Sequence, residues 1–235
     1  GYCLRYVVVN FGNLIGAEFG TNGVGGADVF QGLLSQPDVS IAFALAFMLI
    51  TMLVVMSGVG GGIERVCSVG MPALFFILII CIIRSCTLPG AVDGLKYMFV
   101  PGWALENGVI KEAPDFLTVL ATAGGQMFFS LSLAMGVMFT YGSYLSKKEN
   151  LVKNAALIVF SDTLVALMAG LAVIPAAVAI SGPSATLSGP KLLFITLQDV
   201  FNAMGTAGPL FGVLFYLLVI IAAISSALSL MEVVG

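Results

Sequence analysis

Long apolar runs, separated by shorter polar or glycine-rich segments, dominate the chain. A helix needs about 20 predominantly apolar residues to cross roughly 30 Å of hydrocarbon. Five runs are long enough, and a sixth, at 2–17, has the pattern of the outer end of a helix. The five are residues 41–59, 67–83, 116–145, 155–174 and 209–231. The pattern predicts an all-α integral membrane protein with about five full spans plus the end of a sixth.

Composition supports this class and excludes others. Apolar residues make up 60% of the chain and charged residues 9%, whereas soluble domains carry roughly 25% charged residues. The net charge of -3 argues against a nucleic-acid partner. The sequence contains no His, and Asp162 is the one carboxylate deep within a run, so Ser–His–Asp, Cys–His and paired-aspartate chemistries are excluded. The chain is predicted not to be an enzyme.

The four cysteines show no metal-ligand spacing and fall in or beside apolar runs. We interpret them as small buried apolar residues rather than as disulfide partners.

Loop charge predicts the orientation of the spans. Lys147, Lys148 and Lys153 outnumber Glu149 in the turn after residue 145, whereas the segments 18–38 and 87–115 are rich in acids. Because basic loops lie in the cytoplasm, loops 58–65 and 146–154 are predicted to be cytoplasmic, with the protein in the inner cell membrane. Strict alternation of the spans agrees with both assignments.

Two outer segments are too long to be plain linkers. The segment 87–115 holds Tyr97, Phe99 and Trp103, aromatic residues typical of a membrane interface. The run 155–174 is predicted to end at Pro175. The following segment, 175–208, contains a predicted short amphipathic helix at 193–204. This second segment is open to two interpretations, an external lid or simple surface structure.

The middle of the run 116–145 is rich in glycine and serine and contains Gln126, which weakens a helix at membrane depth. Two interpretations are open. Small residues let membrane helices pack closely. Alternatively, the helix is broken in mid-membrane, so that backbone carbonyls and hydroxyls are free to bind an ion or solute.

Asp162 favours the second interpretation. A carboxylate near the centre of a membrane helix costs at least about 2.5 kcal/mol, and it normally faces the bundle interior with a partner. No Lys or Arg lies at comparable depth, so a bound cation is a natural counter-charge, with Ser130 and Asp162 supplying oxygen ligands. A protonated Asp162 in a packed interface is the alternative. Ser225 and Ser226 form a second oxygen cluster, although such serines often bond back to their own helix.

At these residues the sequence resembles the neurotransmitter:sodium symporters, in particular their bacterial amino-acid branch. The resemblance runs through nearly the whole chain as ordered matches at the right separations. The matching segments are Gly62-Ile63-Glu64-Arg65, Met71-Pro72-Ala73-Leu74, Ile83-Arg84, Leu88-Pro89-Gly90, Gly125-Gln126, Phe128-Phe129-Ser130-Leu131-Ser132-Leu133, Thr140-Tyr141-Gly142-Ser143-Tyr144, Asp162-Thr163, Ile174-Pro175-Ala176 and Phe194-Ile195-Thr196-Leu197.

The resemblance implies a partial inverted-repeat, five-plus-five helix transporter fold. Residues 1–235 would form one transporter domain, incomplete at both ends, from the tail of the family's third helix to its eighth. The run 116–145 would be the broken sixth helix. Substrate would contact Phe129, Ser130, Ser132, Met135, Ser226 and Leu230. Gln126 would belong to the extracellular gate, Ser130 and Asp162 to a first sodium site, and Ala222, Ser225 and Ser226 to a second.

The implied function is sodium-coupled amino-acid symport by alternating access. Two sodium ions are expected as coupling ions, and chloride is not, because Asp162 supplies a negative charge itself. Met135 favours a bulky apolar amino acid. The fragment alone is expected to be inactive, with a sodium-permeable channel and a non-functional truncated remnant as alternatives. The substrate and the lipid bilayer are the expected partners.

Overall fold

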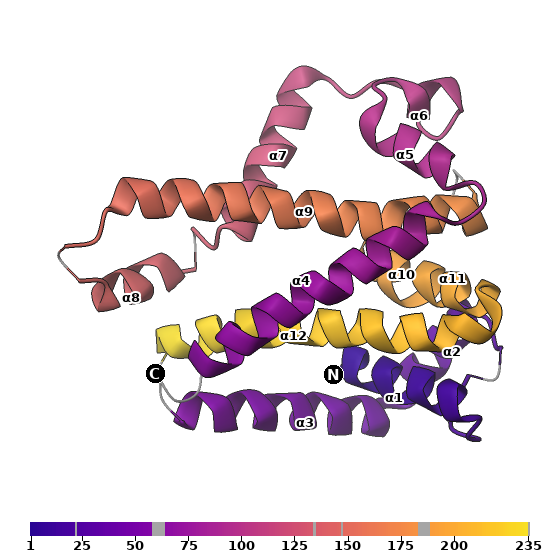
Figure 1. Cartoon of the computed structure of the whole chain (residues 1–235), viewed down its shortest axis with the longest axis horizontal. Coiled ribbons are helices and arrows are strands. Elements are labelled where there is room, and N and C mark those ends of the chain that lie inside the picture. The colour runs from indigo at the N-terminus through magenta and orange to yellow at the C-terminus, as the bar shows by residue number, and fades with distance from the viewer. Residues whose placement is uncertain (22, 58–63, 134, 147, 183–188, 235) are drawn as a thin grey trace.

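A computed structural model describes residues 1–21, 23–57, 64–133, 135–146, 148–182 and 189–234. Within these residues every regular element is helical. Four helices are long and apolar enough to cross a membrane. They are α3 (Pro37–Met56), α4 (Glu64–Cys86), α9 (Leu151–Ser181) and α12 (Gly208–Val234). Helix α4 crosses α9 and α12 at an angle, while α3 lies beyond α12 (Figure 1). The prediction of an all-α, multi-span protein is confirmed.

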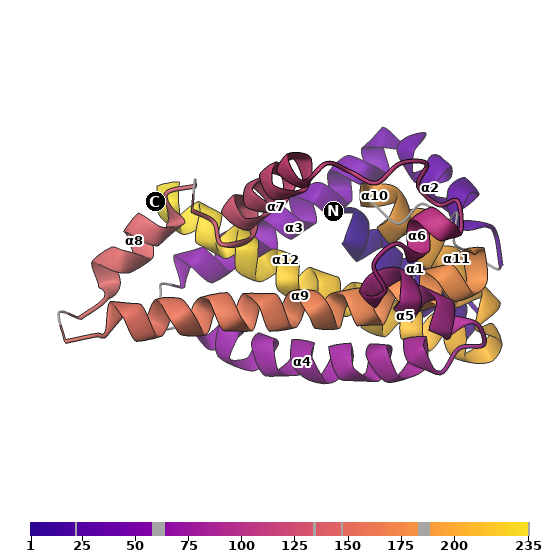
Figure 2. The same ribbon diagram turned by 90° about the horizontal axis from the view of Figure 1, so that it is seen from above.

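Most of the shorter helical elements gather toward one end of the long helices (Figure 2). They are α1 (Tyr2–Ile15), α2 (Gly26–Leu34), α5 (Ala91–Phe99), α6 (Trp103–Glu106), α10 (Gly189–Lys191), the π-helical turn η2 (Leu192–Thr196), α11 (Leu197–Ala203) and the 3-10 turn η3 (Gly205–Ala207). The predicted helix end at 2–17 corresponds to α1. The predicted amphipathic helix at 193–204 corresponds to η2 and α11, which run on from one another.

Local sequence signals explain where several helices begin and end. Pro37 begins α3, where its missing N–H costs no helical hydrogen bond. The side chain of Asp115 caps the start of α7 (Phe116–Ser130) by accepting a hydrogen bond from the N–H of Leu117 at 3.2 Å. Asn150 caps α9 by accepting from the N–H of Lys153 at 3.1 Å. Helix α1 ends at Gly16, which takes the left-handed conformation that glycine adopts without strain.

The predicted helix end at Pro175 is wrong, because α9 continues through this proline to Ser181. The neighbouring elements explain why. The N–H of Ala176 donates to Ser85 Oγ of α4 at 3.0 Å, so a side chain from another helix provides a hydrogen-bond acceptor for the backbone next to the proline. Gly94 of α5 lies directly against the same turn, since a Cβ added there would come within 2.5 Å of Pro175 Cα.

The run 116–145 is not one continuous helix. It is divided into α7 (Phe116–Ser130) and α8 (Val137–Tyr144), and the backbone between them leaves the helical conformation. Ser132 has a φ of 54°, a left-handed conformation that is unusual for a residue other than glycine, and Gly136 has a φ of 76°. Of the two interpretations of this segment, the broken helix is confirmed.

An aromatic cluster joins α1, η2, α11 and α12. Tyr6 and Tyr216 are buried with their ring centroids 4.9 Å apart, and Phe194, Phe201 and Phe215 pack around them. The polar end of each tyrosine bonds to η2: the Tyr6 hydroxyl donates to the carbonyl of Phe194 at 3.0 Å, and the Tyr216 hydroxyl donates to that of Leu193 at 2.9 Å. The segment that contains η2 and α11 is therefore firmly packed.

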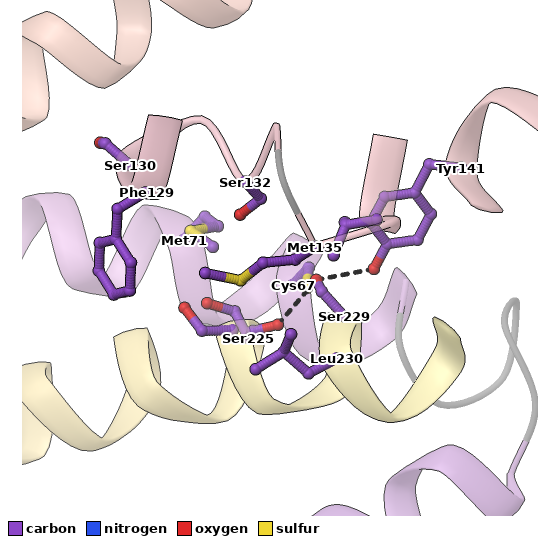
Figure 3. A pocket seen from close by; sticks show the side chains of 12 residues that line it. Cys67, Met71, Phe129, Ser130, Ser132, Met135, Tyr141, Ser225, Ser229 and Leu230 are labelled. Atoms are coloured by element: carbon purple, nitrogen blue, oxygen red, sulfur yellow. Dashed lines mark hydrogen bonds between the residues drawn. The ribbon is translucent and has the colours of Figure 1, made fainter. Parts of the chain in front are cut away.

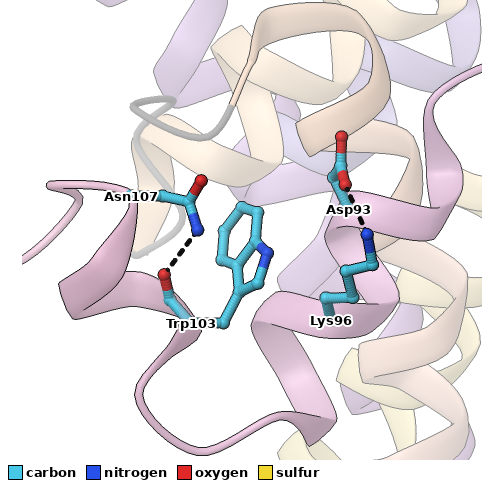
Figure 4. Close-up of polar contacts among 4 residues, drawn as sticks. All are labelled: Asp93, Lys96, Trp103 and Asn107. Carbon is cyan, nitrogen blue, oxygen red and sulfur yellow. Dashed lines mark hydrogen bonds and ion pairs between the residues drawn. The ribbon is translucent and has the colours of Figure 1, made fainter.

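The outer segment 87–115 is also ordered, as α5 and α6. Trp103 is buried and packs edge-on against Tyr97, with ring centroids 6.1 Å apart, while Asn107 Nδ2 donates to the Trp103 carbonyl at 2.8 Å (Figure 4). The ion pair between Asp93 and Lys96, at 3.4 Å, is exposed and contributes little.

Two further predictions concern cysteines and loops. All four cysteines are free, and of the predicted burial only that of Cys81 is complete, since Cys3, Cys67 and Cys86 are half-buried. Residues 58–63 of the first predicted cytoplasmic loop lie outside the described residues, and Glu64 and Arg65 already belong to α4. The second predicted loop, 146–154, leads into α9 at Leu151. Their cytoplasmic placement stays a prediction.

Candidate functional site

A cavity of about 520 Å³ lies where the break between α7 and α8 faces α4 and α12 (Figure 3). Such a volume is within the range of small-molecule sites. Its wall is formed by Cys67, Met71, Phe129, Ser130, Ser132, Met135, Val137, Tyr141, Ser225, Ser226, Ser229 and Leu230. The cavity therefore combines hydroxyl groups with apolar and sulfur-containing side chains, and none of the described residues that line it is charged.

The broken helix explains how several of these side chains reach the cavity. In a continuous helix the positions 129 to 135 would point in all directions around the axis. The turn at Ser132, with its left-handed backbone, instead presents Ser132 and Met135 to the space above α12 (Figure 3). All six residues predicted to contact substrate line this one cavity: Phe129, Ser130, Ser132, Met135, Ser226 and Leu230.

Ser130 and Asp162, the pair predicted for a first sodium site, are in direct contact. Ser130 Oγ lies 2.8 Å from Asp162 Oδ1 and 2.9 Å from Oδ2, so the last residue of α7 donates to a half-buried carboxylate on α9. Asp162 forms no ion pair with any Lys or Arg among the residues that the structure describes. The arrangement thus brings a hydroxyl oxygen and both oxygen atoms of a carboxyl group together beside the break.

Ala222, Ser225 and Ser226, predicted for a second site, form a compact group on α12. Ser225 Oγ donates to the Ala222 carbonyl at 2.9 Å, and Ser226 Oγ donates to the same oxygen at 3.2 Å. Both hydroxyls therefore bond back to their own helix. Of the three residues, Ser225 and Ser226 line the cavity.

Gln126, predicted at the extracellular gate, lies on α7 with an exposed side chain. It stands one helical turn before Ser130 and is not part of the cavity wall. The structure does not bring it together with the other predicted residues.

Five residues of the wall were not predicted. Cys67 and Met71 come from α4, Val137 and Tyr141 from α8, and Ser229 from α12. A signal was available for some of them: Ser229 follows Ser225 by four positions and so lies on the same helix face. Tyr141 is a polar aromatic residue within an apolar run. No comparable signal marks Cys67 or Met71, because α4 is apolar on every side.

Comparison with known proteins agrees with the geometry. A model of the sodium:neurotransmitter symporter family matches residues 27–234. An uncharacterized sodium-dependent transporter of Bacillus subtilis, YhdH, is 38% identical to the chain, over 100% of this chain and 49% of that protein. An uncharacterized sodium-dependent transporter of Haemophilus influenzae is 36% identical, over 85% of this chain and 41% of that protein.

A solved structure is similar as well. The crystal structure of MhsT in complex with L-phenylalanine superposes with a TM-score of 0.78 at 35% sequence identity, covering 99% of this chain and 49% of that chain. The chain therefore spans about half the length of these two transporters and of MhsT.

Proposed function

The chain belongs to the sodium:neurotransmitter symporter family, a family of membrane transporters and not of enzymes, and from this premise we propose that it forms part of a sodium-coupled amino-acid symporter. The coupling ions are sodium, and two sites are proposed for them. Residues 1–235 supply one portion of a longer transporter domain, from the tail of its third helix to its eighth. The remaining helices complete the site, so this portion alone transports nothing.

The contact between Ser130 and Asp162 carries the proposal. A carboxylate inside a membrane protein is costly unless it has a partner, and within the described residues Asp162 has hydrogen bonds from Ser130 Oγ and no basic neighbour. A sodium ion, which is a hard cation, prefers such oxygen ligands. Since Asp162 already supplies a fixed negative charge, transport needs no chloride.

The cavity beside this pair is the proposed substrate site. Ser130, Ser132 and Ser226 offer hydroxyls to the polar groups of an amino acid, and Phe129, Met135 and Leu230 surround its side chain. These apolar residues favour a bulky apolar amino acid, in keeping with the L-phenylalanine complex of the similar structure. Gln126 lies nearer the extracellular end of α7 as part of an outer gate.

Ala222, Ser225 and Ser226 form the proposed second sodium site. In transport by alternating access, sodium and substrate order the segments around the break, and the protein exposes the cavity first to one side of the membrane and then to the other. With loops 58–65 and 146–154 in the cytoplasm of an inner-membrane protein, uptake runs inward along the sodium gradient.

The test uses the full-length protein reconstituted in liposomes. Uptake of labelled leucine and tryptophan is measured in sodium and in choline, without chloride. Saturable uptake that occurs in sodium alone is expected. Sodium currents without saturable amino-acid uptake would indicate a channel instead, and neither uptake nor current would indicate an inactive relative.

The role of Asp162 has its own test. Asp162→Asn keeps the shape of the side chain but removes its charge, and it is expected to raise the half-saturating sodium concentration about tenfold or more, the equivalent of about 1.4 kcal/mol. Thr163→Val is the matched control, because the Thr163 hydroxyl bonds back to the Val159 carbonyl of its own helix at 2.9 Å. Unchanged sodium dependence in Asp162→Asn would show that the carboxylate is not a sodium ligand.

A further inference from the structure

Helix α8 is held against α12 by two phenol groups. The Tyr141 hydroxyl lies 2.8 Å from Ser229 Oγ, and the Tyr144 hydroxyl donates to Glu232 Oε1 at 2.7 Å. In both pairs the partners are 88 positions apart, so the two contacts repeat the same pairing one helical turn along. Within the described part of the chain, α8 packs mainly against α12.

The two contacts differ in their surroundings. Tyr141 and Ser229 both line the cavity (Figure 3), whereas Tyr144 and Glu232 do not. The first contact is therefore next to the proposed site, and the second lies one turn further toward the end of α12. This difference provides a comparison between two chemically similar contacts of the same two helices.

Ser229 connects Tyr141 to the proposed second sodium site. Its Oγ donates to the Ser225 carbonyl at 3.1 Å, and Ser225 Oγ in turn donates to the Ala222 carbonyl at 2.9 Å. A serine hydroxyl has a single hydrogen. Either hydroxyl can donate in the contact between Tyr141 and Ser229, and both contacts of Ser229 are satisfied together when Tyr141 donates to Ser229 and Ser229 donates to the Ser225 carbonyl. Ser229 thus links the Tyr141 hydroxyl to the backbone of the α12 turn that carries Ser225.

The oxygen atoms of the proposed second sodium site are hydrogen-bonded to one another. The Ala222 carbonyl lies within α12 and accepts from Ser225 Oγ and Ser226 Oγ in addition to its place in the helical hydrogen-bond pattern. A cation that binds the Ala222 carbonyl must therefore displace at least one of these hydroxyls. The displaced serine side chain then changes its orientation. Ser229, one turn further along α12, is in contact with Tyr141.

We propose that Tyr141 is a positioning residue that couples the second sodium site on α12 to helix α8. This proposal rests on the proposed function. By fixing Ser229, Tyr141 holds the Ser225 turn in the arrangement that accepts sodium, and sodium in turn favours the docked position of α8. Because linkage is reciprocal, loosening α8 at this contact lowers the affinity for sodium.

The experiment measures leucine binding to the full-length protein in detergent. The sodium concentration that gives half-maximal binding is determined, together with the leucine dissociation constant at saturating sodium. Tyr141→Phe removes only the hydroxyl and is expected to raise the half-saturating sodium concentration about fivefold or more, the lower bound of typical coupling between sites. Because Tyr141 also lines the cavity, the leucine dissociation constant at saturating sodium is measured as well, and the shift in sodium affinity is expected to exceed any shift in leucine affinity.

Two further variants separate positioning from general packing. Ser229→Ala is expected to shift sodium affinity as Tyr141→Phe does, and the double variant is expected to add nothing, since both changes break the same bond. Tyr144→Phe breaks the second contact of α8 with α12 and is expected to leave the half-saturating sodium concentration within about twofold of the wild-type value.

The proposal is overturned if Tyr141→Phe leaves sodium affinity unchanged, if Tyr144→Phe shifts it equally, or if the effects of Tyr141→Phe and Ser229→Ala add. Should Tyr141→Phe fail to fold, Ser229→Ala and Ser229→Thr decide, because threonine restores the hydroxyl. The wild type distinguishes the two levels of failure. Wild-type protein that binds no amino acid in sodium overturns the proposed function and this proposal together, whereas sodium-dependent binding with unshifted variants overturns this proposal alone.

Discussion

Replacing Gln198 with leucine is expected to destabilise the packing of α11 against α1, far from the cavity. Gln198 and Asn10 are both fully buried and form a reciprocal carboxamide pair. Asn10 Nδ2 donates to Gln198 Oε1 at 3.0 Å, and Gln198 Nε2 donates to Asn10 Oδ1 at 3.4 Å. Asn10 keeps one bond after the change, from its Nδ2 to the Tyr6 carbonyl at 2.9 Å.

The loss of stability in Gln198→Leu depends on the buried polar atoms of Asn10 that lose their hydrogen-bond partners. In Gln198→Leu, Asn10 Oδ1 loses the donor that Gln198 provides, and one N–H of its amide loses an acceptor, in a position that water does not reach. A buried polar group without a partner costs about 1–3 kcal/mol. Asn202, which also accepts from Gln198 Nε2 at 3.3 Å, is half-buried and adds less.

The assay is thermal unfolding of the full-length protein in detergent, followed by intrinsic fluorescence. Each kcal/mol corresponds to roughly 2–4 °C in a domain of 150–250 residues, and to less in a longer chain. Gln36→Leu is the matched control. The Gln36 amide is exposed and accepts from Arg5 at 3.3 Å, so its loss is expected to change stability by less than about 0.5 kcal/mol.

The double variant Asn10→Leu with Gln198→Leu tests the reasoning itself. If unsatisfied carboxamide atoms cause the loss, then replacing both partners with apolar side chains of similar shape recovers most of it. The reasoning is refuted if the double variant loses the sum of both single effects, or if Gln198→Leu is as stable as the wild type.

Two further predictions concern the backbone. Gly94→Ala is expected to lower stability by about 1–3 kcal/mol, because the new methyl group would lie 2.5 Å from Pro175 Cα of α9; Gly32→Ala, which meets nothing within 4 Å, is the control, and equal melting temperatures would contradict the close approach. Ser132→Gly is expected to be at least as stable as the wild type, since glycine relieves the strain of a φ of 54°. Ser132→Ala also removes the hydroxyl but is expected to gain no stability. A lower melting temperature for Ser132→Gly than for Ser132→Ala would contradict this prediction.

The sequence predicted the spans well because hydrocarbon thickness imposes a length that apolar runs display directly. The broken helix was harder, since glycine and serine in the run 116–145, taken alone, favoured close packing slightly over a break. Asp162 shifted that balance, and its need for a counter-charge suggested Ser130 and Asp162 as oxygen ligands of one cation before the family resemblance assigned both to a first sodium site. Their contact joins residues 32 positions apart, which periodicity alone could not predict.

Other features depended on neighbours that no local pattern reveals. A proline usually ends a helix, but α9 continues through Pro175. Ser85 of α4 accepts a hydrogen bond from the backbone at this turn, and Gly94 of α5 leaves room for it. Cys67 and Met71 face the cavity from a helix without a polar side, so hydrophobic periodicity could not orient them. The pairing of Asn10 with Gln198 joins residues 188 positions apart.

The polar side chains of the long helices fall into two groups that a sequence alone does not separate. Most hydroxyls bond back to their own helix, as Thr51 does to the carbonyls of Phe47 and Met48 and Thr163 does to that of Val159. Such groups are inexpensive in a membrane and need no function.

The second group bonds across helices, and its members are concentrated at the broken span. Ser130 reaches Asp162 on α9, and Tyr141 reaches Ser229 on α12. Tyr144 reaches Glu232 on α12 from the same broken span. Cases elsewhere include Ser85, which bonds to the backbone at the proline of α9, and Tyr216, which bonds to the Leu193 carbonyl of η2. At the break no proline requires a partner, yet polar side chains on three helices meet around one cavity. Asp162, beside this cavity, bonds to Ser130 with no such backbone reason, and the proposed sodium ion would provide one.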